Sequence, residues 1–183
     1  MGVRLSNLGR REDALAALQE AVTIRGRISK TRPSILSDLA SSLNFLGDEL
    51  LAVGRREAAL RSLESAVSIR RHLAESEPNV FFPDLAASLH SLAICFSSLG
   101  RSEEAVNSLQ DAITIHRRLA ISQPDSVLPN LASSLSVISR ELSSMGRREE
   151  ALKPLQECIA IRGRLADRRV FRPASVLKVD SEV

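Results

Sequence analysis

The segment Leu99-Gly100-Arg101-Ser102-Glu103-Glu104-Ala105 occurs in related form at three other places in the chain. The related copies begin at Leu8, Val53 and Met145, and each continues with glycine and arginine. The glycines are separated by 45, 46 and 46 residues and stand at Gly9, Gly54, Gly100 and Gly146. Self-similarity at a period of about 20 to 50 residues is typical of stacked structural units. The chain is therefore predicted to be a repeat array.

Apolar residues within each repeat follow the spacing of three and four residues that is typical of amphipathic helices. They predict helices over about 12–30, 38–53 and 56–76, and then two further pairs, one opening near Pro83 and one near Pro129. Each pair is joined at a glycine, which can adopt the left-handed conformation that ends a helix. Pro154 lies inside the last helix and is predicted to kink it or delay its start.

The repeats assign residues 1–166 to one array and residues 167–183 to an irregular C-terminal tail. Residues 1–8 align with the second half of a first helix, so the array is predicted to start with a half-unit. Gly2 and Ser6 also match the pattern for N-myristoylation. Gly2 equally falls where the repeat has a small residue, and both interpretations stay open.

Composition limits the classes of function. The chain has 25 basic and 22 acidic side chains, a formal charge of +3, no Trp, no Tyr and five Phe, which makes nucleic-acid binding an unfavoured interpretation. Cys95 and Cys158 form no CxxC motif, so neither a disulfide framework nor a zinc site is predicted, and a cytoplasmic location is expected. The longest uncharged stretch, residues 85–100, is shorter than the ~20 residues of a membrane span.

Six arginines recur with the repeat period. Stacking could align them as a basic ridge for an acidic partner or a nucleic-acid backbone, although a solvated helix face is the favoured interpretation. The set is Arg70, Arg71, Arg117, Arg118, Arg162 and Arg164. Catalysis is not predicted, because the few candidate groups, His72, His90, His116 and the two cysteines, show no nucleophile and base arrangement. His72 and His116 are expected to be solvated. No phosphate-binding loop, dinucleotide motif or metal-ligand spacing occurs, so no cofactor and no metal are expected.

Small residues recur at fixed places in the helix pairs. The first helices have Gly47, Ala93 and Ser139, and the second helices have Ala14, Ala59, Ala105 and Ala151. Large apolar residues follow four positions later, at Leu18, Leu63, Leu109 and Leu155. In this respect the chain resembles the tetratricopeptide repeat family, in the extended form of kinesin light chains and fungal signalling proteins. The resemblance implies an all-α, right-handed superhelical solenoid of antiparallel helix pairs, with Cys158 as a core thiol in an alanine position.

The resemblance also implies a concave groove lined by the first helices. By the family's positions the groove residues are Asn44, Asp48, His90, Ile94, Ser136 and Arg140. The expected function is a scaffold for protein–protein interaction that binds a peptide or protein partner there, although these side chains could equally face only water. The alternative is a regulatory or oligomerising segment of a larger signalling protein, with self-association through uncovered array ends. An enzyme is the third and least favoured interpretation.

Overall fold

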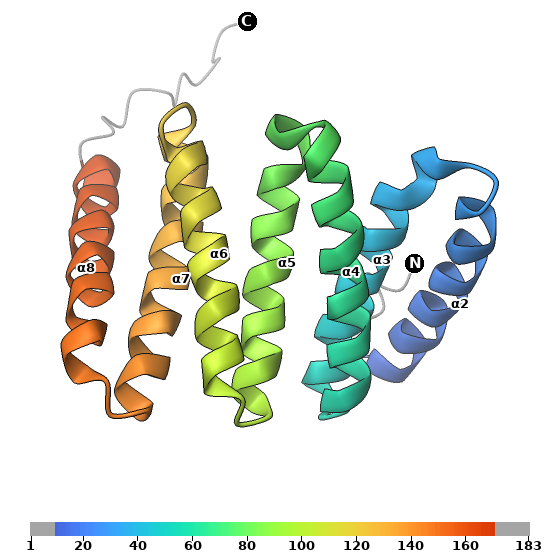
Figure 1. Ribbon diagram of the computed structural model, residues 1–183, viewed down its shortest axis with the longest axis horizontal. Coiled ribbons are helices and arrows are strands. Elements are labelled where there is room, and N and C mark those ends of the chain that lie inside the picture. The colour runs from blue at the N-terminus through green and yellow to red at the C-terminus, as the bar shows by residue number, and fades with distance from the viewer. Residues whose placement is uncertain (1–9, 171–183) are drawn as a thin grey trace, which may run out of the picture.

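The computed structural model describes residues 10–170, and the regular structure within them is helical throughout. The helices follow one another as α2 (Arg11–Ser29), η1 (Pro33–Ile35, a 3₁₀ turn), α3 (Leu36–Ala52), α4 (Arg56–Ser76), α5 (Pro78–Ser98), α6 (Ser102–Ala120), α7 (Pro124–Ser144) and α8 (Arg148–Val170). They lie side by side in chain order, from α2 at one end to α8 at the other (Figure 1). The predicted all-α solenoid of helix pairs is confirmed.

Each α-helix packs mainly against the helix before it and the helix after it in the chain. The first helices of successive units also contact one another, α3 with α5 and α5 with α7. The second helices, which are α2, α4, α6 and α8, therefore form the outer row. The inner row of α3, α5 and α7 is the surface that carries the six predicted groove residues.

The marker glycines end the first helices as predicted. Gly54, Gly100 and Gly146 have φ angles of 77°, 73° and 79°, which a side chain with a Cβ rarely adopts. At each turn the arginine after the glycine donates its backbone N–H back into the helix, as Arg101 does to the Phe96 carbonyl at 2.9 Å. Gly9 lies outside the described residues.

Helices within a pair approach closely at the predicted small residues. A Cβ on Gly47 would stand 2.5 Å from Leu63 Cγ, so glycine is required for the close contact between α3 and α4. Leu63 and Leu109 are fully buried, as expected. The corresponding expectation for Leu155 is wrong: its side chain is 42% exposed, because α8 is the last of the described helices and none of the others covers that face. Cys158 is buried as predicted and its Sγ donates to the Ala132 carbonyl at 3.2 Å.

Two helices begin earlier than the sequence pattern predicted. α5 begins at Pro78 and α7 at Pro124, so Pro83 and Pro129 lie inside these helices instead of opening them. A proline at the first helical position loses no intrahelical hydrogen bond, which makes Pro78 and Pro124 good starts. Pro154 does not delay α8, which begins at Arg148 and continues past the proline.

Two further expectations concern the chain's ends and its membrane contact. The predicted half-unit, Gly2 and the tail beyond residue 170 lie outside the described residues, while α8 continues four residues past the predicted array limit at 166. Among the described helices, α5 is long and apolar enough to cross a membrane by length and composition, with a mean hydropathy of 1.4. Its apolar residues Leu85, Leu89 and Leu92 are buried between neighbouring helices.

Candidate functional site

The six predicted groove residues occupy two equivalent positions on α3, α5 and α7. Asn44, His90 and Ser136 are separated by one repeat of 46 residues each, and so are Asp48, Ile94 and Arg140. Since α3 contacts α5 and α5 contacts α7, each set forms a row across the inner surface. Whether a partner binds these rows stays a prediction.

The second row presents the more accessible side chains. Ile94 is 41% exposed, and the Arg140 side chain is 68% exposed, with its guanidinium 3.7 Å from the Glu141 carboxylate. Asp48 is partly buried and accepts a hydrogen bond from Asn44 Nδ2 at 2.9 Å. Burial raises the pKa of Asp48, while hydrogen bonds from Ser91 and Asn44 oppose that rise. The row therefore combines an acid, an exposed apolar residue and a base.

Two residues of the first row contact the next inner helix: Asn44 accepts from Ser88 of α5, and His90 lies against Ser134 of α7. Between α3 and α5, Arg70 of α4 enters the gap and is only 7% exposed, so its expected place on a solvated face is wrong. Its Nη1 donates to Asn44 Oδ1 at 3.3 Å, to the Asp84 carbonyl at 3.1 Å and to Ser88 Oγ, and its Nη2 donates to Ser41 Oγ at 3.2 Å. We call these five residues the Arg70 joint.

Burial and nearby charges act in opposite directions on the pKa of the Arg70 guanidinium, and burial has the larger effect. Burial lowers the pKa of the Arg70 guanidinium, and the carboxylates of Asp84 and Asp48 act in the opposite direction. Ser88 also donates to Asn44 Oδ1 at 2.6 Å, which joins α3 directly to α5. The buried cation is thus held by several acceptors from both helices.

The equivalent gap between α5 and α7 contains a different set of residues. One repeat after the Arg70 joint, the same positions hold Ala87, His90, His116, Asn130 and Ser134, which we call the His116 joint. His90 Nδ1 lies 3.0 Å from Ser134 Oγ. His116 is 4% exposed, and its Nδ1 has no hydrogen-bond partner among the described residues. The expectation of a solvated His116 is therefore wrong, whereas His72 is exposed as expected.

Burial governs the protonation of both histidines in the His116 joint. It lowers the pKa of His116 to about 4, with a smaller contribution from the charge of His90, and it also lowers the pKa of His90. At neutral pH both imidazoles are therefore uncharged. A cavity of about 270 Å³ opens between them and is lined by Ala87, His90, Ser91, His116, Asn130, Ser133 and Ser134.

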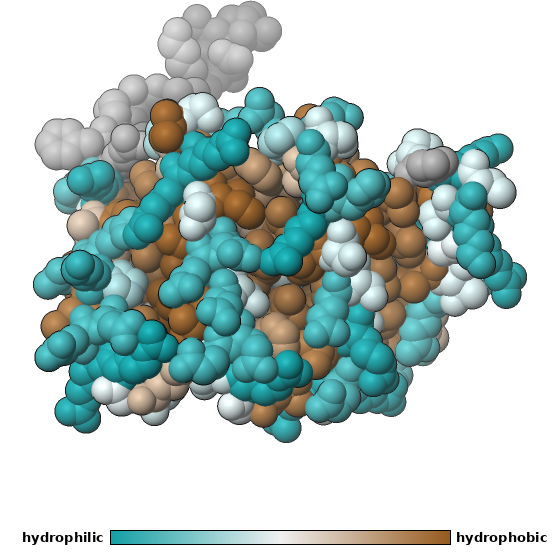
Figure 2. Space-filling view, viewed as in Figure 1, coloured by the Kyte–Doolittle hydropathy of each residue, from teal (hydrophilic) through white to brown (hydrophobic). Residues whose placement is uncertain are grey.

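The outer row carries most of the periodic arginines. Arg71 pairs with Asp111 at 2.8 Å and Arg117 pairs with Glu157 at 2.5 Å, so each tie joins one outer helix to the next. Arg118 lies over the Phe82 ring at 4.9 Å. Figure 2 shows polar side chains forming ridges with apolar strips between them across this view. Intramolecular pairing thus uses part of the predicted basic ridge.

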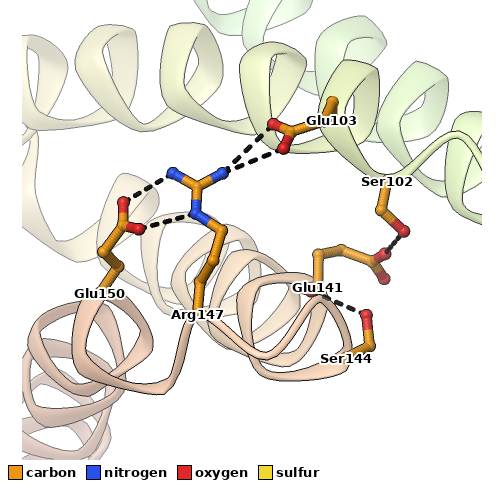
Figure 3. Close-up of polar contacts among 6 residues, drawn as sticks. All are labelled: Ser102, Glu103, Glu141, Ser144, Arg147 and Glu150. Atoms are coloured by element: carbon orange, nitrogen blue, oxygen red, sulfur yellow. Dashed lines mark hydrogen bonds and ion pairs between the residues drawn. The ribbon is translucent and has the colours of Figure 1, made fainter.

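Polar contacts also join successive units at the glycine turns. Arg147, in the turn before α8, donates to Glu150 of α8 at 2.6 Å and to Glu103 of the preceding unit at 3.2 Å (Figure 3). Beside it, Glu141 is 5% exposed and accepts hydrogen bonds from Ser97 at 2.7 Å and Ser102 at 3.2 Å. Exposed ion pairs add little stability, so the buried Glu141 contacts contribute more to the register of α7 against α5 and α6.

A second cavity lies between the outer helices α6 and α8. It has a volume of about 510 Å³ and is lined by α6 and α8, with Leu135, Ile138 and Leu142 of α7 between them. Pro154 and Lys153 line its α8 side. Within the described residues, no three His, Cys, Asp or Glu side chains are arranged to hold a metal ion.

The two joints were missed by sequence reasoning because their central residues are polar. A signal was present: Ser42, Ser88 and Ser134 recur with the repeat period of 46 residues on the inner row and are buried. A serine that recurs on the buried side of a helix needs a hydrogen-bond partner, and the preceding second helix supplies it from Arg25 or Arg70.

Comparisons with known proteins agree with this architecture. The sequence matches the tetratricopeptide repeat over residues 1–31, 39–78, 85–120 and 131–168. No curated protein sequence is significantly similar to the chain. Among solved structures, it is similar to the kinesin light chain TPR-like repeats of Podosopora anserina, with 25% identity, a TM-score of 0.67, and coverage of 90% of this chain and 72% of that one.

Two structures with lower identity show the fold alone. The structure of MamA from residue 41 to its end, from Desulfovibrio magneticus RS-1, has 18% identity and a TM-score of 0.58, with coverage of 88% of this chain and 72% of that one. Aspartyl phosphate phosphatase F from Bacillus subtilis has 17% identity and a TM-score of 0.73. The similarity to the Bacillus protein covers 91% of this chain and 39% of the phosphatase.

Proposed function

The chain belongs to the tetratricopeptide repeat family, and from this premise we propose that it is an interaction scaffold that binds a peptide or protein in the groove of α3, α5 and α7. One observation carries the proposal: three consecutive inner helices present Asp48, Ile94 and Arg140 in one row, of which Ile94 and Arg140 are exposed. An exposed apolar residue between opposite charges suits a peptide that combines apolar and charged side chains. No chemistry of its own is proposed for the chain.

Substitution of the exposed groove residues tests this proposal. A partner is first identified by pull-down and mass spectrometry, and its affinity is then measured by calorimetry for Arg140→Glu and Ile94→Asp. Each variant is expected to weaken binding by about tenfold or more, which corresponds to about 1.4 kcal/mol. Arg164→Glu and Ile121→Asp make the same changes at exposed positions away from the groove and are expected to have no effect. Unchanged affinity in both groove variants, with unchanged helicity, would contradict the proposal.

A second candidate function rests on the uncovered face of α8. Leu152, Leu155 and Ile159 are 53%, 42% and 63% exposed, whereas the equivalent residues of α6, Val106, Leu109 and Ile113, are buried. Such a face can stack on another repeat surface, including that of a second copy. Sedimentation velocity at high concentration tests this: Leu155→Glu is expected to shift an associating population to monomer, and a wild-type chain that is strictly monomeric would exclude self-association.

The proposed location is the cytoplasm. Cys95 and Cys158 are both free thiols buried in the helix packing, a state that a reducing compartment maintains. Fluorescence microscopy of the tagged chain tests this expectation.

A further inference from the structure

Arginines of the second helices contact the following inner helix on one repeated plan. Arg25 of α2 donates to the Asp38 carbonyl at 3.4 Å and to Ser42 Oγ of α3. One unit later, Arg70 of α4 makes the same two contacts with the Asp84 carbonyl and Ser88 Oγ of α5. At Arg25 and at Arg70, a guanidinium from the second helix therefore lies beside a buried serine of the next inner helix.

The His116 joint has the same arrangement one unit later but contains no guanidinium. His116 stands at the position of Arg70, and Asn130 and Ser134 stand at the positions of Asp84 and Ser88. The shorter imidazole leaves the 270 Å³ cavity beside it, and Ala87 replaces the hydroxyl of Ser41. His116 lines this cavity, is 4% exposed and has an unpartnered Nδ1. The joint thus has the frame of a guanidinium site without its occupant.

We infer that this cavity receives the guanidinium of an arginine side chain carried by a bound peptide, an inference that rests on the proposed groove function. The cavity lies between α5 and α7 on the inner row and includes His90, one of the predicted groove residues. Its volume is below the ~300 Å³ at which pockets for drug-sized ligands begin, which suits a single side chain.

The acceptors for such a group are already present. Ser88 donates to Asn44 and still accepts from Arg70, and Ser134 beside His90 can use its hydroxyl in the same way. Ser91 joins the cavity wall to Asp48, whose carboxylate it hydrogen-bonds. Because both imidazoles are neutral at pH 7, they can accept hydrogen bonds without repelling a cation.

The arginine site can be tested without knowing the partner. The probe is N-acetyl-arginine amide, titrated into the full chain while imidazole resonances are followed by NMR. We expect shifts at His116 and His90, none at the exposed His72, and a millimolar dissociation constant. N-acetyl-citrulline amide has the same shape without the charge, and N-acetyl-lysine amide has the charge without the planar fork. Both are expected to bind at least about tenfold more weakly than N-acetyl-arginine amide. Equal binding of citrulline, or no shift at His116, would overturn the inference.

Two variants locate the site. His116→Arg places an internal guanidinium in the cavity, as Arg70 does one unit earlier, and is expected to weaken arginine binding by about tenfold or more. His72→Arg makes the same change on the exposed face of α4 and is expected to leave binding unchanged. Ser134→Ala removes an acceptor with little change in volume and is expected to weaken binding several-fold while helicity is retained. Wild-type affinity in both His116→Arg and Ser134→Ala would contradict the assignment.

The outcome separates this inference from the proposed groove function. If the arginine probe fails while Arg140→Glu still weakens partner binding, the arginine site is overturned and the groove function stands. If the probe binds at His116 while neither groove variant changes partner affinity, the cavity is an arginine site but the groove function fails. Competition of the probe with the partner supports both together.

Discussion

The Arg70 joint and the His116 joint occupy the same place in consecutive repeats, yet one is filled and the other is open. In the first, a guanidinium joins α3 to α5 through four acceptors. In the second, a neutral imidazole borders a cavity between α5 and α7. The backbone plan is the same, so the difference comes from the side chains. A repeat array can thus turn an internal contact into a pocket by shortening one buried side chain.

The comparison also separates two physical roles of a buried polar residue. Arg70 is charged and satisfied, and removing one partner of such a network leaves the others unpaired in a poorly solvated place. His116 avoids that cost by staying neutral, but its Nδ1 lacks a partner. The filled joint therefore specifies how two units stack, whereas the open joint retains unused hydrogen-bonding capacity.

The largest difference is expected from removal of the buried guanidinium. Arg70→Ala removes the donor to the Asp84 carbonyl, Ser88 and Ser41, while Asn44 still accepts from Ser88. Because each unsatisfied buried acceptor costs about 1–3 kcal/mol, the variant should lower the free energy of unfolding by about 3 kcal/mol or more. Arg162→Ala removes the equivalent residue of α8, which is exposed, and should cost at most about 0.5 kcal/mol. Urea denaturation of both variants measures the contrast. Similar losses in the two variants would mean that the Arg70 contacts contribute no special stability.

The next effect is a dependence of stability on pH through His116. Its pKa is about 4 in the folded chain and 6.5 unfolded, so between these values the unfolded chain binds more protons. The contribution of His116 to the free energy of unfolding is therefore fully present above about pH 6.5. It decreases as the pH falls and levels off below about pH 4. The shift corresponds to roughly 3 kcal/mol at most. Burial of His90 acts in the same direction, and the raised pKa of Asp48 acts in the opposite one.

Substitution isolates the contribution of His116 to this pH dependence. The free energy of unfolding is measured from pH 7.5 to 4 for the wild type, His116→Gln and His72→Gln. The glutamine at 116 cannot titrate and should flatten the profile, whereas the change at the exposed His72 should leave the profile as in the wild type. A wild-type slope in His116→Gln would assign the effect to other groups.

The buried serines should differ by a smaller amount. Ser88→Ala removes an acceptor from Arg70 and a donor from Asn44. Because a charged group then lacks one of its partners, the free energy of unfolding is expected to fall by about 1–3 kcal/mol. Ser134→Ala removes only the contact with His90 and should cost about 1 kcal/mol or less. Thermal unfolding of the two variants compares them directly. A larger loss for Ser134→Ala would contradict the prediction that the Arg70 joint contributes more stability than the His116 joint.

The smallest effect is expected when the open joint is converted to the filled type. His116→Arg should add about 1 kcal/mol of stability, because the new guanidinium can bond Ser134 and fill the cavity. Adding Ala87→Ser supplies the hydroxyl that Ser41 provides to Arg70, and should add a further few tenths of a kcal/mol. Chemical denaturation gives both values. A destabilised double variant would show that the α5–α7 gap is too narrow for the guanidinium.

The sequence was sufficient for the architecture because its signals are local. The repeat period, the helix spacing and the turn glycines each depend on residues close together in the chain, and Gly54, Gly100 and Gly146 have the expected positive φ angles. The starts of α5 and α7 were missed because a proline can equally open a helix or lie inside it. At Leu155 the repeat predicted burial, but burial requires a neighbouring helix, and within residues 10–170 none packs on that face of α8.

The site was less predictable because it depends on contacts between units. The row positions of the groove residues follow from the repeat register. The burial of Arg70 and His116 does not, since a polar residue on a helix is normally solvated. Arg70 is buried only because Ser88, 18 residues later, and Asn44, 26 residues earlier, meet it after stacking. The pattern of apolar and polar residues within a single helix does not indicate which hydrogen-bond partners other helices will supply.

The packing of each helix on its immediate neighbours has a consequence for motion. Opening one end of the row costs a single interface, whereas opening the middle breaks two. Amide hydrogens should therefore exchange fastest in α2 and α8 and slowest in α5, giving a gradient of protection along the molecule. The His116 joint lies on the slow side of this gradient, so its shape should persist while the terminal helices fray and reform.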